Sequence, residues 1–199
     1  MGLLATMSSI TRYQVNGHLK EPILETIASG LKKFAIRDID GQPSEQTAGW
    51  TDLKSPYSPD SIESNFSMGV ALVFALRLDK KSVPSKLLNK HFAAECAKRL
   101  KGSERDYLSS NEKQLIKDHI QNKLNIRMPA TPNVYDVVWH YEQGSLWFFS
   151  NLKRANEELE TLFSKSFQLS LIRRIPFTMA TDAPDLNDHQ RDLLLNLSP

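Results

Sequence analysis

Apolar residues recur along this chain at two spacings, one typical of strands and one typical of helices. Residues 9–15 alternate between two faces and end at Asn16-Gly17, which predicts a strand followed by a turn. A helix then opens at Pro22, since a proline's missing N–H has no consequence in the first turn. The apolar stripe of this helix consists of Ile23, Ile27, Leu31 and Phe34, with Leu24 and Ala28 beside them.

Two further strands follow, separated by an irregular stretch. Residues 45–53 predict a short strand in which Gly49 lets another backbone come close and Trp50 is a core aromatic residue. Residues 54–68 hold two prolines and five serines, which is typical of irregular structure. Residues 69–78 are rich in Val, Leu, Phe and Ala and predict a strand.

Two basic helices in the middle of the chain are predicted to form a helical hairpin. The first begins at Ser85 and has apolar residues at four-residue steps, namely Leu88, Phe92, Cys96 and Leu100. The second is capped by Ser109 or Ser110 and ends near Ile126. Its predicted inward residues are Leu115, Ile116, Ile120 and Leu124, and its predicted outward residues are Lys113, Lys117 and Lys123.

The last third of the chain predicts two strands, a helix and a final strand. The strands at 134–141 and 145–150 are apolar on both faces, so we expect both to be central in their sheet. The helix follows from about Leu152, and the final strand covers residues 167–175.

These elements predict an α+β fold of two small antiparallel sheets with packed helices and the basic helical hairpin in the middle. The order of the elements indicates an approximate internal duplication, with halves at about residues 9–101 and 110–176. One folded region therefore covers residues 1–176. Residues 177–199 form an acidic tail with room for a short helix at 188–197.

Composition places the chain among ordinary globular proteins, since 40% of its residues are hydrophobic and 24% are charged. It holds no run of about 18 apolar residues, and its first residues lack the basic start and cleavage site of a secretory signal. The single cysteine, Cys96, excludes an internal disulfide and a cysteine-based zinc site and is interpreted as a small buried hydrophobe. We expect a cytoplasmic protein with no membrane partner.

The small net charge of +2 conceals an uneven distribution. Residues 77–127 hold thirteen Lys and Arg against six Asp and Glu, a net charge of +7, whereas the flanking segments carry −2 and −3. Such a segment suits the neutralisation of phosphates, although Lys is also common on any exposed helix face. The candidate DNA contacts are Arg77, Lys80, Lys81, Lys86, Lys90, Lys98, Arg99, Lys101, Arg105, Lys113, Lys117, Lys123 and Arg127.

Motifs for catalysis or cofactor binding are few. Glycine-rich phosphate loops are absent, and the five histidines form no H-E-x-x-H pattern. His91 and Glu95 have the four-residue spacing of a metal-binding pair on a helix, but this spacing is also common among exposed residues. Asp38 and Asp40, joined by Asp136 or Asp79, leave a metal-dependent nuclease open as an alternative. We therefore predict no catalytic residue, no bound metal and no cofactor.

Six segments in a fixed order resemble the recombination-associated protein RdgC family over about residues 9–176. They are TRYQVNGHL at 11–19, FAIRDID at 34–40, Gly49-Trp50, LRLDKKSVP at 76–84, LSSNEK at 108–113 and PNVYDVVW at 132–139. Each motif is weak by itself, and their order and spacing carry the resemblance.

The resemblance implies a non-enzymatic protein that binds double-stranded DNA with little sequence preference and limits the access of the recombinase RecA to DNA. It also implies a nucleoid-associated homodimer, ring-shaped and basic inside. The family's older exonuclease label corresponds to no catalytic motif in this sequence. Two alternatives remain, a metal-dependent exonuclease and a protein-interaction module whose basic helices meet an acidic partner.

Overall fold

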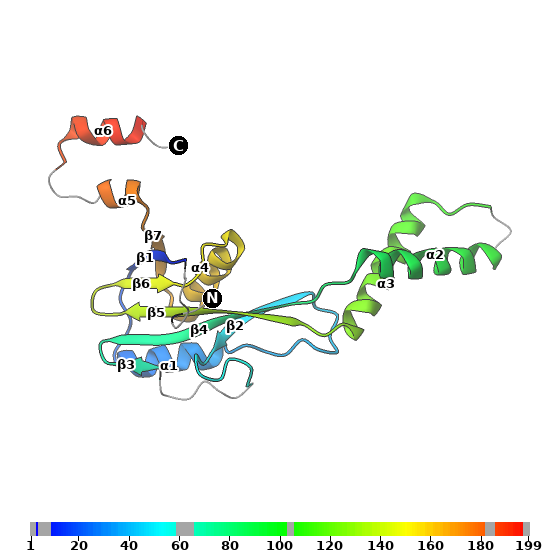
Figure 1. Cartoon of the computed structure of the whole chain (residues 1–199), viewed down its shortest axis with the longest axis horizontal. Coiled ribbons are helices and arrows are strands. Elements are labelled where there is room, and N and C mark those ends of the chain that lie inside the picture. Colours follow the sequence, from blue (N-terminus) through cyan, green and yellow to red (C-terminus); the bar gives the residue numbers. More distant parts are fainter. Residues whose placement is uncertain (1–2, 4–8, 59–65, 103–105, 182–185, 197–199) are drawn as a thin grey trace. The chain divides into compact units, whose positions relative to one another are not determined.

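The computed structural model describes residues 3, 9–58, 66–102, 106–181 and 186–196. Its elements in chain order are β1 (Thr11–Asn16), α1 (Ile23–Lys33), β2 (Gln46–Thr51), β3 (Ser67–Met68), β4 (Ala71–Lys80), α2 (Ser85–Lys101), α3 (Ser110–Arg127), β5 (Thr131–His140), β6 (Ser145–Phe148), α4 (Lys153–Phe167), β7 (Ser170–Arg173), α5 (Pro176–Thr181) and α6 (Asp188–Asn196) (Figure 1). The predicted α+β class is confirmed. The short strand β3 and helix α5 were not predicted, whereas α6 matches the short helix expected in the tail.

The strands form one sheet of seven, in the order β2-β4-β5-β6-β1-β7 with β3 paired to β4. Two small sheets were predicted, so the sheet arrangement differs from the expectation. The difference arises because β1 pairs antiparallel with both β6 and β7, which joins strands from the two predicted halves. The expectation that β5 and β6 are central is correct.

Two compact units divide the chain. Unit 1 contains residues 1–36, 48–77 and 134–199, and unit 2 contains residues 37–47 and 78–133. Unit 2 is thus built from two separate stretches of sequence, and the units do not coincide with the predicted halves.

The core of unit 1 lies between the sheet and helices α1 and α4. Trp139 on β5 contacts Phe163 and Phe167 of α4, with ring centroids 5.0 and 5.3 Å apart. Trp50 is fully buried against Phe74 and donates a 2.7 Å hydrogen bond from its indole N–H to the Ser166 hydroxyl. These contacts confirm Trp50 as a core residue and give its polar atom a partner.

Gly49 permits the close backbone approach that the sequence predicted. A Cβ atom at this position would lie within 2.5 Å of two backbone atoms of Ile36. Around this point the Trp50 N–H donates to the Phe34 carbonyl, and the Ile36 N–H donates to the Trp50 carbonyl, both at 2.9 Å. The glycine therefore lets the chain after α1 pair with β2.

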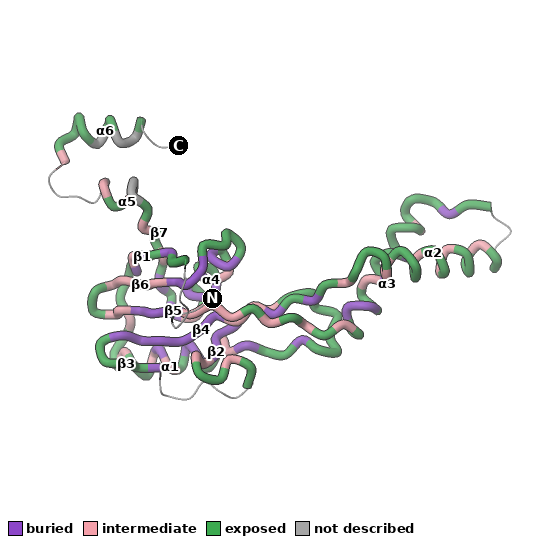
Figure 2. The backbone as a smooth tube through the Cα atoms, in the orientation of Figure 1, coloured by how far each residue is buried: buried purple, intermediate pink, exposed green. Residues whose placement is uncertain are grey.

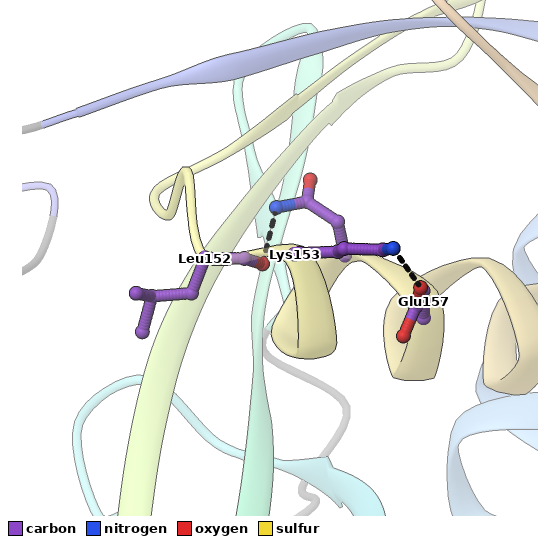
Figure 3. A network of polar contacts seen from close by, with 4 residues as sticks. Leu152, Lys153 and Glu157 are labelled. Carbon is purple, nitrogen blue, oxygen red and sulfur yellow. Dashed lines mark hydrogen bonds and ion pairs between the residues drawn. The ribbon is translucent and has the colours of Figure 1, made fainter.

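Polar side chains anchor the start of α4 to β1. The buried Tyr13 hydroxyl donates to Asn156 Oδ1 (2.6 Å) and lies 2.9 Å from Glu160 Oε1. The Asn156 amide in turn donates to the carbonyl oxygen of Leu152 at 2.8 Å, beside an exposed Lys153–Glu157 ion pair of 3.9 Å (Figure 3). Burial and the hydrogen bond to Glu160 both raise the pKa of Tyr13.

Candidate nucleic-acid interface

Helices α2 and α3 of unit 2 share a small apolar core. Ile116, Ile120 and Leu124 of α3 are buried together with Leu108, and the partly buried side chains packed against them include Leu88, Phe92, Cys96 and Leu100 of α2. The predicted stripe on α2 is therefore confirmed. On α3 the prediction fails for Leu115, whose side chain is 67% exposed, because it lies about 100° around the helix from Ile116.

Helix α2 contains no buried residue in its whole length (Figure 2). Its apolar stripe packs against the buried residues of α3. Four lysines, Lys86, Lys90, Lys98 and Lys101, fall within about 120° of the helix circumference, on the side opposite the stripe. We call these four residues the lysine face of α2; all four are exposed.

Most of the predicted DNA contacts lie at the surface of unit 2. The exposed ones are Lys80, Lys86, Lys90, Lys98, Arg99, Lys101, Lys113, Lys117, Lys123 and Arg127. Arg105 lies outside the described residues. Arg77 belongs to unit 1 and is half-buried, and its guanidinium donates to the Pro56 carbonyl at 3.3 Å and lies 6.0 Å from the centre of the Tyr57 ring.

Lys81 does not lie at the surface, so the structure corrects its assignment as a phosphate contact. The side chain is only 4% exposed, and its Nζ donates to the carbonyl oxygens of Gln42 (2.7 Å) and Asn125 (2.8 Å). The Asn125 carbonyl belongs to the last turn of α3, whose carbonyls have no partner inside the helix. Lys81 therefore caps the C-terminus of α3 with a positive charge.

The start of α3 carries a complete capping box. The Ser109 hydroxyl accepts from the Glu112 N–H (3.3 Å), and the Ser109 N–H donates to Glu112 Oε2 (2.8 Å). Of the two serines that the sequence offered as caps, Ser109 performs this role. Both ends of α3 are thus held by side chains.

Two grooves lie between α2 and α3. The larger has a volume of about 270 Å³ and presents Lys113, Lys117 and Gln114 beside Leu88 and Phe92. The smaller, which we call the histidine groove, has a volume of about 110 Å³. It is lined by His91 and Glu95 of α2 and by His119, Lys123 and Arg127 of α3.

The sequence interpretation did not include His91 or His119 in the candidate interface. Each belongs to a row at four-residue spacing, 91–95 on α2 and 119–123–127 on α3, which places each row on one side of its helix. The 119–123–127 row could have been recognised from the sequence as a basic side of α3. That the two rows face each other depends on how the helices pack.

The carboxylates considered for a nuclease site make other contacts. Asp38 Oδ1 accepts from the Asp40 N–H, and Asp40 Oδ1 accepts from the Ala130 N–H, each at 2.8 Å. Asp136, in unit 1, accepts from the Leu3 N–H. Among the residues that the structure describes, no group of three or more His, Cys, Asp or Glu could hold a metal ion.

Glu95 forms an ion pair with Arg99 at 3.6 Å, on the same helix as His91. This pair has the i, i+4 spacing at which oppositely charged side chains meet on one side of a helix. No helix within the described ranges is both long enough and apolar enough to cross a bilayer.

No protein-family model matches the chain, and no curated protein matches it either.

Proposed function

We propose that this chain binds double-stranded DNA with little sequence preference, through the lysine face of α2 and the basic residues of α3. The observation that carries the proposal is the lysine face itself. Its four charged side chains are exposed and lie opposite the stripe of Leu88, Phe92, Cys96 and Leu100 that packs against α3.

The geometry of this face suits a phosphate backbone. From Lys86 to Lys101 the helix rises about 22 Å, the length of between six and seven base pairs at about 3.4 Å each. Lysine is a flexible point charge without a fixed fork of donors, so it neutralises phosphates without reading bases. Binding of this kind has little sequence preference.

The biological role in this proposal comes from the resemblance to the RdgC family. A nucleoid-associated protein that covers duplex DNA through a basic surface, as a homodimer, limits the access of RecA to that DNA and so modulates recombination. The role requires binding alone, without a catalytic step.

The test is the salt dependence of duplex binding. Fluorescence anisotropy with two duplexes of unrelated sequence, between 50 and 300 mM salt, gives the affinity and the slope of log K against log salt. Replacing Lys86, Lys90, Lys98 and Lys101 by Gln should lower the steepness of this slope by up to about 0.9 for each lysine that neutralises a phosphate.

The matched control replaces Lys20, Lys32, Lys33 and Lys165, four exposed lysines of unit 1, by Gln. It removes the same total charge and should leave most of the affinity intact. Equal losses in the two variants would show a general charge effect and would contradict an interface on α2. Absence of DNA binding at 50 mM salt, together with binding to an acidic protein, would favour the protein-interaction alternative.

A further inference from the structure

The histidine groove brings together more positive charge than its single carboxylate balances. Lys123 and Arg127 line it on one side, and the carboxylate of Glu95 on the other side is already paired with Arg99. His91 and His119 complete the polar lining. The groove is therefore cationic when the imidazoles are neutral and more so when they are protonated.

The volume of the histidine groove suits a small group. A volume of about 110 Å³ matches three or four water molecules at about 30 Å³ each. Small-molecule sites usually measure about 300–1,000 Å³. One phosphate group fits such a space.

Apolar atoms strengthen the site. Ile120 and Leu124, which are 6% exposed, line the same groove, so its floor excludes water on one side. Charge-assisted hydrogen bonds to phosphate gain strength where water is partly excluded. Arg127 and Lys123 supply permanent donors, and each imidazole has two N–H donors once protonated.

We propose that the histidine groove binds a phosphate group of the nucleic-acid backbone, and that protonation of His91 and His119 strengthens this binding. The proposal rests on the proposed DNA-binding function and names one subsite of it. Imidazoles change charge between about pH 5 and pH 8, and a bound phosphate favours the protonated form. The charged groups facing the two imidazoles are Glu95 on α2 and Lys123 and Arg127 on α3.

The first experiment measures duplex DNA affinity by anisotropy at pH 6 and pH 8 in constant salt. Each imidazole that becomes protonated and contacts a phosphate adds up to about 0.9 to the steepness of the salt slope. At 0.1 M salt this increases the affinity by up to about eightfold. We expect the affinity at pH 6 to exceed that at pH 8 by about three- to tenfold. The double variant His91→Gln, His119→Gln should lose this difference and keep the affinity seen at pH 8.

The matched control is the double variant His18→Gln, His189→Gln, two exposed histidines outside unit 2. It should retain the full pH difference. If the control loses the difference, or if the groove variant keeps it, the phosphate subsite is refuted while DNA binding itself stands.

A second experiment separates this proposal from the proposed function. NMR of the imidazole protons during titration with inorganic pyrophosphate at pH 6 should shift the His91 and His119 signals and leave His18 and His189 unchanged. Shifts without any duplex binding would support the anion site and contradict the DNA-binding function. No shift of either groove histidine at millimolar pyrophosphate would overturn the subsite.

Discussion

The Nζ of Lys81 donates a 2.8 Å hydrogen bond to the carbonyl oxygen of Asn125, across 44 positions of sequence. Asn125 is itself 1% exposed, and its amide Nδ2 donates to Glu45 Oε1 at 3.3 Å. The backbone of Lys81 also donates to the Glu45 carbonyl at 2.8 Å. One lysine thus ties the end of α3 to the 37–47 stretch within unit 2.

Replacing Lys81 by Met should destabilise the protein because the carbonyl oxygens of Gln42 and Asn125 lose a charged donor. Met retains most of the apolar stem, so the expected loss of about 1.5–3 kcal/mol reflects the hydrogen bonds. Urea denaturation followed by circular dichroism measures it. The control Lys80→Met changes an exposed neighbour and should alter stability by less than about 0.5 kcal/mol. Equal stability of the two variants would show that the Lys81 contacts contribute nothing.

Replacing Ser109 by Ala should weaken the start of α3. The change removes the hydroxyl that accepts from Glu112 N–H, and loss of an N-cap costs about 1 kcal/mol. Ser110→Ala, one residue further on, is the matched control and should have little effect. A larger loss of stability in the Ser110 variant would mean that the cap lies there instead.

The two neighbouring apolar residues of α3 should respond differently to truncation. Ile116 is fully buried, so Ile116→Ala should cost about 2–4 kcal/mol through reduced burial and the cavity left behind. Leu115→Ala, at an exposed position, should change stability by less than about 0.5 kcal/mol. Thermal unfolding of both variants distinguishes them, and a large loss for Leu115→Ala would indicate that another surface covers this side chain.

A methyl group at position 49 has no space. Gly49→Ala would place its Cβ against the Ile36 backbone, which cannot move aside like a flexible side chain, so we expect a loss of more than about 2 kcal/mol. Gly41→Ala is a useful comparison, since a Cβ there meets no atom within 4 Å and only the backbone angle φ of +74° opposes it. Comparable stability of the Gly49 variant and the unmodified chain would contradict the close approach.

Ionisation of Tyr13 should destabilise the folded state at alkaline pH. Burial raises the pKa of Tyr13 above the ordinary value of 10.0, so the unfolded chain loses this proton first as the pH increases. The stabilising effect of the neutral phenol is complete below about pH 10 and declines above it. Tyr13→Phe should therefore show a smaller decline in stability from pH 9 to pH 11 than the unmodified chain, as measured by urea denaturation. An identical decline would assign the alkaline sensitivity to other groups.

The sequence by itself determined the helices and most strands of this protein. The stripe Leu88, Phe92, Cys96, Leu100 specified the contact side of α2, and Ser109 with Glu112 specified the start of α3. Both features follow from the spacing of residues within a single helix, so the local sequence is enough to predict them. The pairing allowed by Gly49 was also visible, because only glycine admits a backbone so near.

Only the tertiary structure decided the single sheet, the buried Lys81 and the histidine groove. The pairing of β1 with β6 and β7 joins residues more than 130 positions apart, and no periodicity records such a partner. Lys80 and Lys81 are adjacent and of the same residue type, yet Lys80 is exposed and Lys81 is buried. The difference arises because the hydrogen-bond partners of Lys81 are the carbonyl oxygens of residues 42 and 125, which are distant in sequence. Charge counts locate a basic segment, but the packing of α2 on α3 determines which of its charges meet.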